Sequence, residues 1–433
     1  MLELLINPPL GVVTRPQVEQ ESLTARVASI IEEVKAYGDR ALFSLTQQYD
    51  KVALSELMVP QEALKEAHKY LEPALKEAIK RAMQNIYKFH VAQRAPDETV
   101  ETEEGVLCWR KSVPLERIGI YIPGGSAPLF STLLMLAVPA QIAGCQEIIV
   151  TTPAQKDGSV HPAILYAASL CKLTKIFKVG GAQAIAALAY GSESIPRVDK
   201  IYGPGNRYVT EAKQQVAQKV CAIDLPAGPS EVMVVIDALS NTSFAAADLI
   251  SQAEHDSASQ VVLVVVAEGE VQGGVRIVEE VRQKIVEQTK LLKRQAIINE
   301  ALKHSWAVVI TDSQRVAPFI NDYAPEHLII NTANYRELAE EVQSAGSVFL
   351  GKYACESIGD YAAGTNHTLP TSRWARSFSG VSLDSFYKKI TFQEITKEGL
   401  QSIGESVKIL AEAESLQAHA NAVQIRLNQM EER

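Results

Sequence analysis

The sequence predicts an α/β protein with two parallel-sheet domains, and three observations support this fold class. Short apolar runs alternate with helical patterns along residues 118–206, as in βαβ units. The alternation resumes over residues 232–350, after a connector that contains two prolines and a glycine. A chain of 433 residues is also too long for one hydrophobic core. We expect two Rossmann-like but incomplete domains with a small N-terminal and a helical C-terminal appendage.

The chain divides at changes in these patterns. Residues 1–20 contain three prolines and are expected to form an extension that reaches away from the body. Residues 21–118, with helical patterns at 22–48 and 60–90, are grouped with residues 232–380 as one discontinuous α/β domain. Residues 119–231 form an inserted Rossmann-like domain, and residues 381–433 form a helical segment.

The first alternation contains four strands, each followed by a turn. We expect these strands at 118–122, 147–152, 175–179 and 200–202, with helices at 133–143, 163–170 and 183–190. Glycine pairs follow three of these strands. Ligands bind at the carboxyl ends of parallel strands, where glycine lets the backbone approach a ligand closely. None completes the G-x-G-x-x-G fingerprint, so tight turns that only need glycine explain the pattern equally well.

The second alternation contains apolar strands at 232–236, 260–266, 307–310, 327–330 and 347–350. A helix over 248–255 lies between the first two, and a long helix is expected from about 275 to 302. Helix returns from about 396 to 430. Gln252 and His255 share a face of the first of these helices, because residues three apart lie close around the helix axis.

An amide oxygen and an imidazole at one helix end are half of a metal site. A satisfied histidine beside a solvated glutamine would give the same pattern. Later in the chain, Asp360 and further histidines supply nitrogen and oxygen ligands for a borderline metal such as zinc. Glu326 and His327 are left as an acid–base pair. The other candidate histidines are His367 and His419.

The composition limits the partners. The chain is 47% apolar and 21% charged, as in ordinary globular proteins, and its net charge of −9 argues against nucleic acid or an anionic membrane surface. The first nine residues lack the basic and apolar regions of a secretory signal, and no apolar run approaches membrane-spanning length. Five scattered cysteines indicate reduced thiols. We expect a cytoplasmic protein (or one in an organelle stroma, if a transit peptide has been removed) that acts on a small molecule.

Eight short motifs, in order along nearly the whole chain, resemble those of the histidinol dehydrogenase family. They are residues 121–129 (YIPGGSAPL), 180–186 (GGAQAIA), 202–206 (YGPGN), 226–231 (PAGPSE), 251–255 (SQAEH), 325–328 (PEHL), 364–367 (GTNH) and 418–423 (AHANAV). The family oxidises L-histidinol to L-histidine through the aldehyde, with two NAD reduced and one zinc ion per site.

The resemblance implies a role for each candidate residue and an intertwined homodimer held by residues 381–433. The metal ligands would be Gln252, His255, Asp360 and His419. His419 and Glu414 would be contributed by the other subunit across the dimer interface. Glu326 and His327 would be the catalytic acid–base residues. The substrate, L-histidinol, would contact Ser230, His327, His367, Glu414 and the four metal ligands. NAD would contact Tyr121, Gln183 and Asn206, which places NAD in the inserted domain and the metal in the discontinuous one.

The chemistry of the reaction fits this assignment. Histidinol offers an imidazole and an amine to a zinc ion, which would position the substrate. A neutral imidazole at His327 is suited to take the hydroxyl proton as hydride leaves for NAD. Oxidation of the aldehyde requires a nucleophile. Cys145 and Cys355 have no adjacent histidine, so we interpret them as packing residues and expect Glu326 to activate water.

Glu414 and His419 are five residues apart, which on an unbroken helix separates their side chains by about 140°. Both can serve one site only if the helix breaks between them, so we predict a break near Ser415. One departure from the family pattern is the run Asp256–Ser259 after His255, where a turn containing glycine or proline is expected.

Three other functions compete with this interpretation. The first is a zinc- and NAD-dependent dehydrogenase of another small polyol, such as a sulfonated diol, whose substrate would not need His367 and Glu414. The second is a zinc hydrolase, which would leave the glycine-rich strand ends without a purpose. The third is a non-catalytic paralogue, against which the intact metal and base residues argue.

Overall fold

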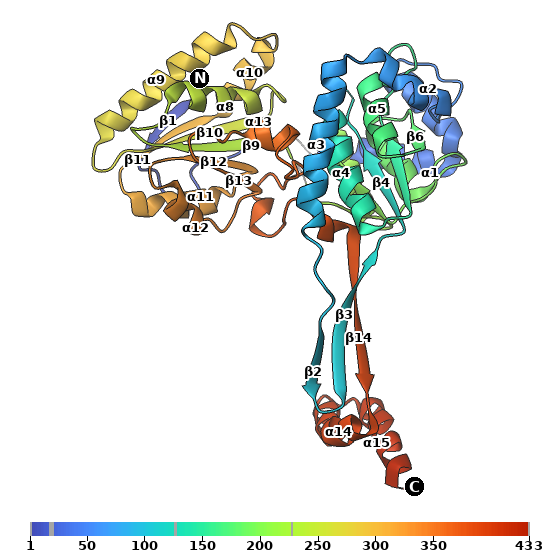
Figure 1. Ribbon diagram of the computed structural model, residues 1–433. Coiled ribbons are helices and arrows are strands. Elements are labelled where there is room, and N and C mark those ends of the chain that lie inside the picture. Colours follow the sequence, from blue (N-terminus) through green and yellow to red (C-terminus); the bar gives the residue numbers. More distant parts are fainter. Residues whose placement is uncertain (1, 17–20, 125–127, 227, 432–433) are drawn as a thin grey trace. The chain divides into compact units, whose positions relative to one another are not determined.

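The structure is a computed structural model that describes residues 2–16, 21–124, 128–226 and 228–431. The chain divides into two compact units, one of Met1–Gln93 with Leu115–Phe386 and the other of Arg94–Pro114 with Tyr387–Arg433. Both parallel sheets lie in the first unit, which confirms the predicted α/β class (Figure 1). Part of the turn after the first of the predicted strands, residues 125–127, lies outside the described residues.

The smaller sheet of the first unit has five parallel strands in the order β6-β5-β4-β7-β8. In chain order this is the Rossmann-like arrangement, which changes direction between β4 and β7. The strands are β4 (Arg117–Tyr121), β5 (Glu147–Thr151), β6 (Lys175–Phe177), β7 (Lys200–Tyr202) and β8 (Ala222–Ile223). The helices that connect them are α4 (Phe130–Ala143), α5 (Pro162–Leu170), α6 (Gly181–Tyr190) and α7 (Arg207–Ala217).

The N-terminal helices complete this smaller layer, so the expected grouping of residues 21–118 with residues 232–380 is wrong. Helix α1 (Glu21–Tyr49), interrupted at Gly38, shares one apolar core with α6 and α7. Helix α4 is apolar on nearly every side, and α3 (Pro73–Val91) packs on it. The short helix α2 (Gln61–Glu66) packs on α5. The physical reason is that α4 and α6 are apolar on the faces that point away from the sheet, and α3 and α1 bury these faces.

The larger sheet has six parallel strands in the order β1-β11-β10-β9-β12-β13. They are β1 (Glu3–Ile6), β9 (Glu231–Ile236), β10 (Gln260–Val266), β11 (Trp306–Ile310), β12 (His327–Asn331) and β13 (Ser347–Leu350). Helices α8 (Thr242–Ala253), α9 (Val271–Thr289) and α10 (Gln295–Ala301) cover one face (Figure 1). Helices α11 (Val316–Tyr323) and α12 (Tyr335–Glu340) cover the other.

Two expectations for this half are wrong. The start of the expected extension does not reach away from the body, because Glu3–Ile6 pairs as an edge strand with β11 before the prolines end it. Residues 17–20 of that extension lie outside the described residues. The long helix expected from 275 to 302 is two helices, since α9 ends at Thr289 and α10 begins at Gln295.

The second unit contains an antiparallel sheet and two helices. Its strands are β2 (Thr99–Glu103), β3 (Val106–Pro114) and β14 (Tyr387–Ile395), in the order β14-β3-β2, and its helices are α14 (Lys397–Ala413) and α15 (Gln417–Glu431). Residues 381–433 are therefore helical only in part, because they contain β14. The predicted helix break is confirmed: Ser415 has φ 63° between α14 and α15. Within the described ranges, no helix has the length and apolar character needed to cross a membrane.

Candidate active site

The predicted catalytic pair lies at the amino edge of the larger sheet. His327 is the first residue of β12 and pairs in register with Val232 of β9. Its Nδ1 lies 3.2 Å from the carbonyl oxygen of Glu231 and its Nε2 lies 3.3 Å from Oδ1 of Asp360. The Glu326 carboxylate accepts a hydrogen bond from the backbone N–H of Glu231 at 2.7 Å. Both catalytic candidates are therefore held rigidly by the start of β9.

Three carboxylates surround His327, and we call Glu326, Glu356 and Asp360 the acidic cluster. Their residues are 6%, 1% and 9% exposed, so water screens their charges poorly. Burial lowers the pKa of His327, but Glu326 and Asp360 more than offset this effect and hold its pKa well above the usual value. This direction differs from the neutral ring expected at His327.

The acidic cluster carries more negative charge than His327 can balance. Burial, with the neighbouring carboxylates, raises the pKa of Glu356 to about 8. Burial also raises the pKa of Asp360, but the hydrogen bond and charge of His327 leave it below its usual value. A divalent cation would relieve this surplus, because buried carboxylates need a compensating positive charge.

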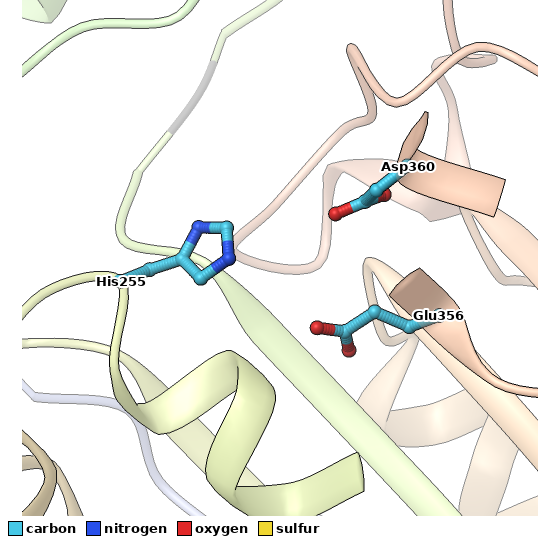
Figure 2. Close-up of side chains that lie close together, drawn as sticks. All are labelled: His255, Glu356 and Asp360. Carbon is cyan, nitrogen blue, oxygen red and sulfur yellow. The ribbon is translucent and has the colours of Figure 1, made fainter. Parts of the chain in front are cut away.

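Ligand atoms for such a cation are present. One ring nitrogen of His255 and one carboxylate oxygen each of Glu356 and Asp360 all lie within 4.8 Å of one another. Figure 2 shows the three side chains pointing toward one another, with His255 on the turn after α8 and both carboxylates on α13 (Glu356–Tyr361). An imidazole with two carboxylates is a donor set that suits zinc and related divalent ions. The residues present therefore fit a metal site.

Gln252, the other predicted ligand on α8, is completely buried in the last turn of the helix. Its amide meets complementary partners at both ends when the oxygen faces the N–H of Glu231 at 3.0 Å and the nitrogen faces Glu356 at 2.7 Å. The structure thus brings Gln252, His255 and Asp360 together, as predicted.

The remaining predicted substrate residues of the first unit lie close by. His367 contacts the carbonyl oxygen of Asp360 through Nδ1 at 3.0 Å and the hydroxyl of Thr132 on α4 through Nε2 at 3.1 Å. Burial lowers the pKa of His367. Ser230 immediately precedes β9. Glu414 and His419 belong to the second unit, where both side chains are exposed, Glu414 at the end of α14 and His419 in the first turn of α15.

Tyr121, Gln183 and Asn206 line one cavity of about 640 Å³ at the carboxyl edge of the smaller sheet, which we call the α6 cavity. Tyr121 ends β4, and its hydroxyl accepts the N–H of Gly181 at the start of α6. Gln183 is buried on α6. Asn206 caps α7, with its side-chain oxygen accepting the N–H groups of Tyr208 and Val209. The three residues predicted to contact NAD are therefore brought together.

Two residues of the site were missed in the sequence. Glu356 precedes Asp360 by four residues, a helical spacing that places both on one face and could have been noticed. Glu231 is buried and paired with Arg15, whose Nη2 lies 2.8 Å from Oε2 of Glu231. No local pattern connects Arg15 with Glu231. Burial raises the pKa of Cys145 to about 12, which supports its interpretation as a packing residue.

Comparisons with known proteins extend over nearly the whole chain. The profile of the family described as histidinol dehydrogenase matches residues 13–427. A histidinol dehydrogenase from Bacteroides thetaiotaomicron is 52% identical over 414 residues, which cover 96% of this chain and 95% of that protein. A protein from Oryza sativa named "Histidinol dehydrogenase, chloroplastic" is 47% identical over 423 residues, covering 97% and 88%. The crystal structure of histidinol dehydrogenase from Elizabethkingia anophelis has a TM-score of 0.95 and 47% identity and covers 99% of both chains.

Proposed function

The chain belongs to the histidinol dehydrogenase family, and from this premise we propose that it oxidises L-histidinol to L-histidine through the aldehyde, with one zinc ion per site and two NAD reduced. Membership makes it an NAD-dependent oxidoreductase of histidine biosynthesis that acts on an alcohol and its aldehyde. The observation that carries the finer proposal is the acidic cluster around His327, beside the ring nitrogen of His255.

Gln252, His255 and Asp360 would hold the zinc ion, and His419 from the second copy of the chain in a homodimer would be the fourth ligand. When bound, zinc would take the imidazole and amine nitrogens of histidinol and so orient the carbon that loses hydride. The ring of His367 is fixed between Asp360 and Thr132 and would contact the substrate, together with Ser230 and the Glu414 of the second copy.

His327 would act as the base in the first oxidation. It takes the hydroxyl proton while hydride passes from the adjacent carbon to NAD, which leaves the aldehyde. The base must be neutral, although Glu326 and Asp360 favour its protonated form. If Asp360 binds the zinc ion, the metal offsets the negative charge of this carboxylate. Asp360 then raises the pKa of His327 less, and the neutral ring is populated near pH 7.

Glu326 would act in the second oxidation. It accepts a proton from a water molecule as the hydroxide adds to the aldehyde, which gives the anion of the hydrate. Hydride then leaves this anion for a second NAD and gives the carboxylic acid, which releases its proton to solvent to become the carboxylate of histidine. The Glu231 N–H holds the Glu326 carboxylate at 2.7 Å and thus fixes its direction. Cys145 would not be the nucleophile, because burial raises the pKa of its thiol and keeps the group protonated.

The α6 cavity would bind NAD. Its position at the carboxyl ends of β4, β5 and β7 is where Rossmann-like sheets bind nucleotides. Gln183 is buried, lines the cavity and offers an amide to the cofactor. Asn206 keeps its side-chain nitrogen available because its oxygen caps α7.

The test is NADH formation from L-histidinol by the purified protein. We expect two NADH for each L-histidinol consumed, loss of activity with a chelator, and recovery when zinc is restored. A sulfonated diol should give no NADH. Oxidation of the diol but not of histidinol would contradict the substrate, and one NADH per histidinol would contradict the two-step reaction.

A further inference from the structure

We propose that Arg15 is a positioning residue that fixes the start of β9, whose backbone holds both catalytic candidates, Glu326 and His327. Arg15 lies in the segment between β1 and α1, outside the eight motifs that carry the family resemblance. This role rests on the proposed function, in which Glu326 and His327 are the acid–base pair. Arg15 is far from both of them in the sequence and acts through Glu231.

Glu231, the first residue of β9, holds the pair through its backbone. Its N–H donates to Oε2 of Glu326 at 2.7 Å, and its carbonyl oxygen lies 3.2 Å from Nδ1 of His327. A carbonyl oxygen can only accept a hydrogen bond, so this contact places hydrogen on Nδ1 and leaves Nε2 as the nitrogen that takes the substrate proton. A shift of the Glu231 backbone would therefore misplace both catalytic groups.

The pairing of strands supports this part of the backbone from one side. Glu231 pairs with Gln260 of β10, but the pairing with β12 begins one residue later, between Val232 and His327. Glu231 is therefore at the end of the ladder on the side of the catalytic pair. Its residue is only 2% exposed, so contacts of its buried side chain help to fix its position there.

Arg15 anchors that side chain. Its guanidinium makes a two-pronged contact with the Glu231 carboxylate, Nε with Oε1 and Nη2 with Oε2, the latter at 2.8 Å. Nη2 also donates to the carbonyl oxygen of Tyr323 at 2.8 Å, and the guanidinium carbon lies 4.1 Å from the centre of the Tyr323 ring. A planar guanidinium that is held by a ring and a carbonyl oxygen has a fixed orientation. It therefore fixes the direction of the carboxylate.

Charge adds to this effect. The Glu231 carboxylate is buried and close enough to Glu326 for the two charges to repel each other, so it needs a compensating cation. Arg15 supplies that cation. Without it, repulsion would turn the Glu231 side chain away from Glu326, and the backbone N–H of Ser372, 2.9 Å from Oε1, would be left to hold the carboxylate.

The alternative is an ion pair that only stabilises the fold. The N-terminal segment has other attachments, because β1 pairs with β11 and the carbonyl oxygen of Thr14 accepts Nε2 of Gln260 at 2.9 Å. Truncation of Arg15 therefore leaves the segment docked and tests the side chain alone. A pair that only stabilises would change the unfolding temperature, whereas a positioning residue changes turnover by the folded enzyme.

The experiment measures NADH formation from L-histidinol by the full-length holoenzyme and its variants. Arg15→Met/Glu231→Gln removes both charges together, so no buried charge is left uncompensated and the fold should be kept. We expect kcat to fall about ten- to a hundredfold, because small displacements of catalytic groups have effects of this size. KM for L-histidinol and the zinc content should stay within about twofold of the wild type. The single variant Arg15→Met should lose at least as much kcat and also unfold at a lower temperature.

Arg282→Met is the matched control. The side chain of Arg282 is as buried as that of Arg15, 17% against 16% exposed, and it also holds the N-terminal segment, through the carbonyl oxygen of Leu2. It lies on α9, where its ion-pair partner is Glu279. This variant should unfold at a lower temperature and keep the wild-type kcat.

Three outcomes would overturn the proposal. The first is a wild-type kcat in both Arg15 variants, or an effect on KM alone. The second is an equal loss of kcat in Arg282→Met. The third is loss of zinc, because the Glu231 N–H also lies 3.0 Å from the Gln252 amide oxygen and Arg15 would then act through a proposed ligand. A wild-type protein that forms no NADH from L-histidinol would instead contradict the proposed function, which is a distinguishable failure.

Discussion

At the scale of single residues, the site concentrates negative charge where water cannot screen it. The acidic cluster surrounds one imidazole, and a fourth buried carboxylate, Glu231, is balanced by Arg15. Burial raises the pKa of Glu231 in spite of that pairing. Such an arrangement costs free energy of folding and is tolerated where a bound cation or a reaction makes use of it.

The role of His327 can be separated from a ligand role. We expect His327→Asn to lower kcat by about two to four orders of magnitude, because the base is lost while its contacts are partly kept. Zinc content should stay at the wild-type level, as measured by metal analysis of the dialysed protein. His68→Asn, which changes an exposed histidine, is the control and should behave as the wild type. Loss of zinc from His327→Asn would show that a ligand had been mistaken for a base.

The sequence was sufficient to predict the residues that meet around His327, since Gln252, His255, Glu326, Asp360 and His367 all lie there. Glu356 could have been found from its helical spacing to Asp360, whereas Glu231 could not, because its partner Arg15 is more than two hundred residues away in the chain. The raised pKa of His327 was also out of reach, because it depends on carboxylates brought together from several parts of the chain. The roles of Glu414 and His419 stay predictions.

At the scale of elements, the turn after β7 shows how the α6 cavity is formed. Gly203 has φ +119°, and a Cβ atom there would lie 2.1 Å from the backbone oxygen of Tyr121 on the neighbouring strand β4. Its N–H donates to Asp224, which also pairs with the buried Lys213. The turn can therefore pass β4 only without a side chain.

We expect Gly203→Ala to lower the free energy of unfolding by about 2 kcal/mol or more, because backbone strain and a clash with a backbone atom act together. Gly269→Ala is the matched control: φ there is +67°, and no heavy atom lies within 4 Å of the added Cβ. It should cost about 1 kcal/mol from strain alone. Denaturant unfolding of both variants measures the difference. Equal losses would mean that the close approach to Tyr121 contributes nothing.

Predicted and observed elements agree where burial leaves a pattern in the sequence. Nine strands of the two parallel sheets lie within about two residues of their expected positions, because they are continuous apolar runs. The edge strands β1 and β8 were not expected. All three strands of the antiparallel sheet, β2, β3 and β14, were missed. The residues of β2 and β14 are almost all exposed and leave no alternation to detect. The partners of α1 and α3 were assigned wrongly, because an apolar helix face does not specify which sheet it covers.

At the scale of the whole molecule, the proposed homodimer makes a specific prediction about shared sites. If His419 completes the site of the other copy, His255→Asn and His419→Asn should each be inactive as homodimers. A heterodimer of the two variants, purified through two different tags, should regain about half of the wild-type activity, because one of its two sites has every ligand. NADH formation from L-histidinol measures the recovery. An inactive heterodimer would place His419 and His255 in the site of the same copy.

The two candidate binding regions use opposite edges of two different sheets. The α6 cavity lies at the carboxyl ends of the smaller sheet, whereas the acidic cluster lies at the amino ends of the larger one. Neither His255 nor Glu356 is among the residues that line the α6 cavity. If the α6 cavity binds NAD, as proposed, substitutions in the acidic cluster can change which alcohol is oxidised while the residues that hold the hydride acceptor stay the same.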